Sequence, residues 1–125
     1  YPDKLPFEES SFDMAVLFFS MGLIDKKRYR KKALAEISRV LDEKGKLYIW
    51  DINVKHICFG LRRSVEVILP GQESDILDIT TPVRIGSYKA KKLLPEIENY
   101  FDVLSVDEYD EYFSIAAVKK SFVNV

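Results

Sequence analysis

The chain has very few of the residues that build disulfides, metal sites or nucleotide loops. Among 125 residues there is one cysteine, Cys58, which excludes an internal disulfide and fits a reducing cytoplasm. The only histidine, His56, lies two residues away, but one imidazole and one thiol cannot supply the three or four ligands of a zinc site. We therefore expect no metal site and a cytoplasmic location.

Long apolar runs and an excess of charge of one sign are also absent. The longest apolar run, Met14 to Phe19, is far too short to cross a bilayer. Nineteen Lys and Arg residues face 20 Asp and Glu residues, which gives a net charge of −1. This balance gives no electrostatic reason to expect nucleic acid or an anionic membrane as the main partner.

Glycine is scarce and scattered. The five glycines are isolated and none forms a G-x-G step, so no glycine-rich phosphate loop is present in these residues. Hydrophobic residues make up 47% and charged residues 31%, as in an ordinary folded protein. The length allows one domain, residues 1–125, with one core, but is short for a complete doubly wound enzyme.

The first half of the chain has the pattern of a strand, a helix and a second strand. Residues 12–20 are apolar without alternation, which favours a parallel strand covered on both faces over a buried helix segment. After the charged stretch from Asp25 to Lys32, an apolar stripe predicts an amphipathic helix: Ala33, Leu34, Ile37, Val40 and Leu41. We expect it to stop near residues 42–45, where Gly45 can be left-handed. Residues 46–52 form the second strand, parallel to the first.

The second half is less regular at its start. Arg63 to Leu69 and Ile76 to Val83 tend to alternate around Pro70-Gly71, which predicts a hairpin or an irregular excursion within residues 53–86. Arg62-Arg63 could meet an anionic substrate or lie at the surface.

A helix and two strands close the chain. Ser87 is a candidate cap for a helix with the stripe Ala90, Leu93, Leu94 and Ile97, and Pro95 should kink or restart it. Asp102 to Tyr109 and Tyr112 to Lys119 are strands, and their two-residue link predicts an antiparallel pair.

Several short motifs follow one another in a fixed order: Leu5-Pro6-Phe7, Ser11-Phe12-Asp13, the apolar strand to Ser20, Ala33-Leu34-x-Glu36-Ile37-x-Arg39-Val40-Leu41, and Gly45-x-Leu47. The kinked helix near residues 87–99 and the last strand, ending in Lys119-Lys120, complete the pattern. In order and spacing the chain resembles the second half of class I S-adenosylmethionine-dependent methyltransferases of the small-molecule type with an LPF segment.

The resemblance implies an α/β fold: half of a Rossmann-like methyltransferase sheet in the order 4-5-7-6, with the last strand antiparallel, flanking helices and the hairpin at 53–86. We expect one helix on each face. It implies methyl transfer from S-adenosylmethionine to an unidentified small molecule. The glycine loop and the ribose-binding acid would lie in a front half that this chain lacks, so we expect the chain alone to bind the cofactor poorly and to be inactive.

The resemblance also places the site residues, because open parallel sheets bind ligands beyond the carboxyl ends of their strands. Phe19, Ser20 and Met21 would face the cofactor, and Asp51 would face the methyl acceptor. Alternatively, Phe19 and Met21 are core residues and Ser20 satisfies a backbone group. Methyl transfer depends on alignment and exclusion of water. Asp51 is therefore either a base, needed only if the acceptor retains a proton, or a hydrogen-bond partner.

The strand Met14–Phe19 would have an unpaired apolar edge without its family neighbour, and such an edge promotes aggregation unless it is covered. We expect it to pair with a second copy, with the absent front half or with a swapped segment. The basic run Lys26 to Lys32 is expected to be the solvated first turn of a helix rather than a nucleic-acid patch. A non-catalytic association module that uses this fold for oligomerisation is the alternative function.

Overall fold

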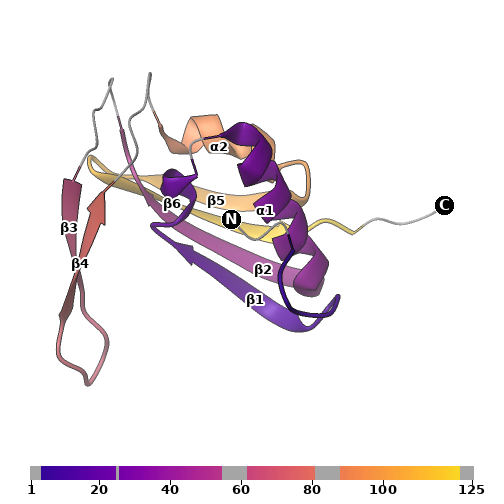
Figure 1. Cartoon of the computed structure of the whole chain (residues 1–125), viewed down its shortest axis with the longest axis horizontal. Helices are drawn as coiled ribbons and strands as arrows, with labels where there is room; N and C mark the ends of the chain where they lie inside the picture. The colour runs from indigo at the N-terminus through magenta and orange to yellow at the C-terminus, as the bar shows by residue number, and fades with distance from the viewer. Residues whose placement is uncertain (1–3, 25, 55–61, 81–87, 122–125) are drawn as a thin grey trace.

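The computed structural model of the chain describes residues 4–24, 26–54, 62–80 and 88–121 (Figure 1). In chain order the elements are β1 (Phe12–Phe18), the 3-10 turn η1 (Met21–Leu23), α1 (Lys27–Val40), β2 (Leu41–Ile52), β3 (Arg62–Val67), β4 (Asp75–Thr80), α2 (Ala90–Ile97), β5 (Phe101–Glu108) and β6 (Tyr112–Lys119). His56, Cys58 and the candidate cap Ser87 lie outside the described residues.

Four strands form one sheet in the order β1-β2-β6-β5. β1 and β2 are parallel, whereas β6 runs antiparallel to both of its neighbours. With β1 taken as the fourth strand of a methyltransferase sheet, this is the order 4-5-7-6 with the seventh strand reversed. The predicted sheet topology is therefore confirmed.

Both helices cover the same face of the sheet (Figure 1). Side chains of α1 and α2 share one core cluster with Leu47 and Ile49 of β2, and Arg30 of α1 is paired with Glu96 of α2 at 3.0 Å. The expectation of one helix on each face is wrong. The connections β1–α1–β2 and β2–α2–β5 cross the sheet in the same direction, and crossovers of one hand in one direction put both helices on one face.

The sheet consequently has one packed face and one open face. Phe113, Ile115 and Ala117 alternate along β6 toward the helices and are buried. On β1 the opposite set is open, with Met14 and Val16 each 53% exposed. The expected coverage of β1 on both faces is therefore wrong for this chain, because both helices lie on the other side.

The turn between α1 and β2 is tighter than predicted. The helix ends at Val40, and Leu41, expected on its apolar stripe, already begins β2 and is fully buried. The left-handed residue is Lys44, with φ +64°, not Gly45. Gly45 is needed for close packing instead, because a Cβ there would lie 2.9 Å from the Leu41 Cβ and from the Asp42 carbonyl oxygen.

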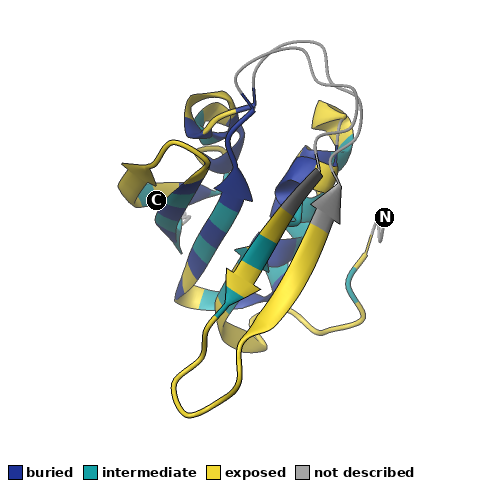
Figure 2. Cartoon of the chain, turned by 90° about the vertical axis from the view of Figure 1, so that its left-hand side faces the viewer, coloured by how far each residue is buried: buried dark blue, intermediate teal, exposed yellow. Residues whose placement is uncertain are grey.

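β3 and β4 form an antiparallel hairpin of their own, as one of the two sequence alternatives predicted. The hairpin projects beyond the carboxyl ends of β1 and β2, and most of its described residues are exposed (Figures 1 and 2). α2 includes Pro95 and ends two residues after it, at Ile97.

Candidate functional site

The chain turns sharply where β1 ends. Phe19 adopts φ +53°, an uncommon backbone conformation for a bulky residue, and its N–H donates to the Trp50 carbonyl oxygen at 2.8 Å. The ring of Phe19 is largely buried and meets Phe18 edge to face, with centroids 4.6 Å apart. Backbone strain of this kind persists only where surrounding contacts hold it, and it occurs often at functional sites.

A buried carboxylate stands beside this turn. Asp51, near the carboxyl end of β2, accepts hydrogen bonds at Oδ2 from the Gly22 N–H, at 2.6 Å, and from the Tyr88 hydroxyl, at 2.8 Å. Its Oδ1 accepts from the Ile52 N–H at 2.9 Å. Both carboxylate oxygens are thus engaged, and the side chain is buried.

The Asp51 carboxylate joins three segments that are distant in sequence. Gly22 belongs to η1, and Tyr88 pairs through its backbone with Val54 just before α2. A Cβ at Gly22 would lie 2.8 Å from Asp51 Oδ1, so a side chain there would displace the carboxylate. Glycine at position 22 therefore lets η1 approach the end of β2.

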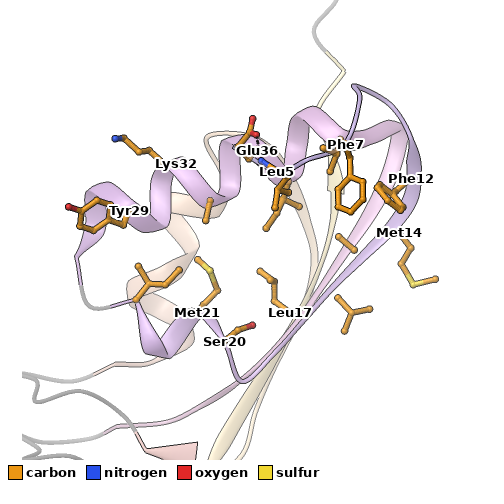
Figure 3. A pocket seen from close by; sticks show the side chains of 16 residues that line it. Leu5, Phe7, Phe12, Met14, Leu17, Ser20, Met21, Tyr29, Lys32 and Glu36 are labelled. Carbon is orange, nitrogen blue, oxygen red and sulfur yellow. Dashed lines mark hydrogen bonds between the residues drawn. The ribbon is translucent and has the colours of Figure 1, made fainter. Parts of the chain in front are cut away.

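An apolar hollow of about 460 Å³ opens between α1 and the outer edge of β1; we call it the edge hollow (Figure 3). Figure 3 shows Ser20 and Met21 at one end of it and Phe7 and Phe12 at the other. Its remaining lining includes Leu5, Met14, Leu17, Tyr29, Lys32 and Glu36.

A second hollow, of about 420 Å³, lies at the carboxyl ends of β1 and β2 and is bounded by the β3–β4 hairpin. We call it the hairpin hollow. It is lined by Phe18, Phe19, Trp50, Ile52, Ser64, Val65, Glu66, Glu111 and Tyr112.

Three of the predicted site residues, Phe19, Ser20 and Met21, are consecutive in the chain but are divided between the two cavities. Ser20 and Met21 line the edge hollow, and Phe19 lines the hairpin hollow. Asp51 lines neither but binds the backbone of η1 between them. Their cofactor and acceptor roles stay predictions.

The LPF segment is held on α1 by an ionic cluster. The Leu5 N–H donates to Glu36 Oε1 at 2.7 Å, and Arg39 donates from Nε to Glu36 Oε2 at 2.7 Å and from Nη2 to the Leu5 carbonyl oxygen at 3.1 Å. The hydrogen bond from Arg39, and then that from the Leu5 backbone, lowers the pKa of the Glu36 carboxyl. Two motifs noted separately in the sequence are thus one contact in the structure.

Sequence reasoning missed the buried role of Arg30. The basic run Lys26 to Lys32 predicts a solvated first turn, yet the Arg30 guanidinium is buried, pairs with Glu96 and donates to the Ile24 carbonyl oxygen at 2.9 Å. Only its position one turn before Leu34 on the apolar stripe could have indicated burial.

No cluster of three or more potential metal ligands occurs among the described residues. Within the same part of the chain, no helix combines the length and apolar character needed to span a membrane.

Comparison with known proteins assigns the fold. Residues 2–49, from the LPF segment through most of β2, match the family model described as "Methyltransferase domain". The fold is that of a class I S-adenosylmethionine-dependent methyltransferase. A methyltransferase described as SAM-dependent, from Methanosarcina mazei, matches with a TM-score of 0.60 and 19% identity over 94% of this chain and 63% of its own.

Two further solved structures show the range of proteins with this methyltransferase fold. The 1,6-didemethyltoxoflavin-N1-methyltransferase of Burkholderia thailandensis, solved with 1,6-didemethyltoxoflavin and S-adenosylhomocysteine, matches with a TM-score of 0.61 and 15% identity, over 97% of this chain and 49% of its own. The [4+2]-cyclase SpnF matches with a TM-score of 0.61 and 18% identity, over 94% and 53%. The chain thus spans about half to two-thirds of these structures. No curated protein matches it in sequence.

Proposed function

We propose that the chain is the acceptor-side half of a methyltransferase that moves a methyl group from S-adenosylmethionine to a small molecule. The observation that carries the proposal is the strand order β1-β2-β6-β5 with β6 reversed, together with the family match over residues 2–49. The M. mazei and B. thailandensis matches are methyltransferases, and the second was solved with S-adenosylhomocysteine. The cyclase match is a reminder that fold alone does not fix the reaction.

In this proposal the end of β1 is the boundary between cofactor and acceptor. Ser20 and Met21 would lie on the cofactor side, and Phe19 would separate it from the hairpin hollow. A rigid, strained turn suits a reaction that depends on alignment and exclusion of water.

The contacts of Asp51 support a positioning role more directly than the predicted role as a base. Its oxygens already accept three hydrogen bonds, which fix η1 and the segment before α2. Bonds to three separate backbone and side-chain donors hold the carboxylate in one place, which is what a positioning role requires.

Among the described strands, β1 lies at an edge of the sheet, and this supports a proposed partner, either a second copy in a dimer or a front half of the enzyme. Either would cover the exposed side chains of Met14, Val16 and Phe18. The lone cysteine supports the proposed location in the reducing cytoplasm.

Calorimetric titration and the upstream coding sequence test the proposal. The chain alone should bind S-adenosylhomocysteine poorly, because its glycines form no phosphate loop; micromolar binding to a monomer would contradict this. A glycine loop followed by an acidic residue, encoded upstream, would support the proposal that the chain is part of an enzyme. The protein made from that longer coding sequence should then release S-adenosylhomocysteine during turnover. A start codon directly before Tyr1 would instead favour the association module.

A further inference from the structure

The hairpin hollow has aromatic walls. Phe18, Trp50 and Tyr112 line it from three neighbouring strands, and Phe19 lines it from the turn after β1. Phe18 and Trp50 have ring centroids 6.3 Å apart. Aromatic walls bind flat groups through their faces and attract cations through the ring quadrupole. A volume of about 420 Å³ is suited to a small molecule.

The charged side chains that line this hollow, among the described residues, are both acidic: Glu66 on β3 and Glu111 in the turn before β6. The one short hydroxyl there, Ser64 Oγ, already donates to Asp78 Oδ1 at 2.7 Å. The described lining thus combines negative charge with ring faces. Both features favour a cation, whereas acidic side chains repel a carboxylate or phosphate.

A buried asparagine, Asn53, holds the backbone of one wall in place although it does not line the hollow itself. Asn53 donates through its backbone N–H to the Glu111 carbonyl oxygen at 3.0 Å, and its side-chain nitrogen donates to the carbonyl oxygens of Tyr109 and Tyr112. Its Oδ1 is buried and has no hydrogen-bond partner within the described part of the chain.

We propose that the hairpin hollow binds a small planar amine in its protonated form. If the bound amine is also the methyl acceptor, that part of the inference rests on the proposed function. Binding itself follows from the aromatic lining and the Glu66 carboxylate.

The chain's single tryptophan, Trp50, lines the hollow and provides the signal for the test. Three probes with one ring and different charge are titrated without cofactor: phenethylamine, 2-phenylethanol and 3-phenylpropionate. Phenethylamine should change Trp50 fluorescence at the lowest concentration, and 3-phenylpropionate at the highest. Glu66→Gln should weaken phenethylamine binding about two- to fivefold and leave 2-phenylethanol unchanged.

Glu73→Gln is the matched control, since Glu73 is exposed in the hairpin turn and does not line the hollow. It should leave all three affinities unchanged. Equal binding of the three probes would overturn the amine proposal. Tightest binding of the carboxylate would also overturn it and would favour the anionic substrate considered for Arg62-Arg63. Neither result bears on methyl transfer, whereas intact amine binding by an enzyme that transfers no methyl group would overturn the proposed function alone.

Discussion

At the scale of single residues, the candidate site contains a buried carboxylate, Asp51, that accepts several hydrogen bonds. Asp51 accepts from Gly22, Tyr88 and Ile52, and Gly22 has no Cβ to disturb it. The sequence indicated that Asp51 ends a strand, but not that its partners come from positions 22 and 88. Those partners are set by tertiary packing, which no local pattern encodes.

Removing the Tyr88 hydroxyl tests how much these hydrogen bonds contribute to the free energy of unfolding. Tyr88→Phe keeps the buried ring but deletes a hydrogen bond to a charged acceptor, and we expect the free energy of unfolding to fall by about 1.5–3 kcal/mol. Tyr109→Phe, at a residue that is 51% exposed, should change it by less than about 0.5 kcal/mol. Urea denaturation measures both, and equal losses would argue against a supporting role for Asp51.

At the scale of elements, periodicity predicted where most helices and strands lie. β6 has the predicted bounds, and β5 is displaced by one residue. The α1–β2 turn was predicted less well, because Gly45 suggested a left-handed cap while Lys44 adopts that conformation. The common face of the two helices also escaped prediction, since it depends on the direction of each crossover rather than on either helix.

The contact between the LPF segment and α1 should make stability depend on pH. The lowered pKa of Glu36 means that its contribution is fully present above the ordinary value of 4.5 and is lost as the pH falls through the folded-state pKa. Denaturation of the wild type and of Glu36→Gln should therefore differ at pH 7 and converge in acid. Glu73→Gln is the control: its free energy of unfolding should differ from that of the wild type by an amount that does not depend on pH in this way. A wild-type advantage over Glu36→Gln that grew in acid would contradict the prediction.

At the scale of the whole molecule, the two faces of the sheet differ. The buried core lies on the helix side, and within the described part of the chain the other sheet face and the β1 edge are open. Charge balance and composition could not predict this, because they do not say which strand lies at an edge. The apolar, non-alternating sequence of β1 did indicate a strand that needs covering, and that requirement supports a partner.

A charge placed on this edge should weaken self-association. Val16 is 53% exposed on β1, and Val16→Lys should weaken dimer formation at least about tenfold, because pairing would bring the ammonium groups into an apolar contact. Val106→Lys on β5, at the opposite edge, is the matched control and should have no such effect. Light scattering across a concentration series measures the dimer. A wild-type chain that stays monomeric throughout would dispose of the second copy as partner.

The core of this chain is packed between the helices and one face of the sheet. A segment or partner that covers the other face can therefore differ in sequence without repacking of the core. The hairpin, too, extends from the strand ends as a separate two-stranded unit. Substitutions in the covering partner or in the hairpin can therefore change ligand preference while the β1–α1–β2 unit keeps its geometry.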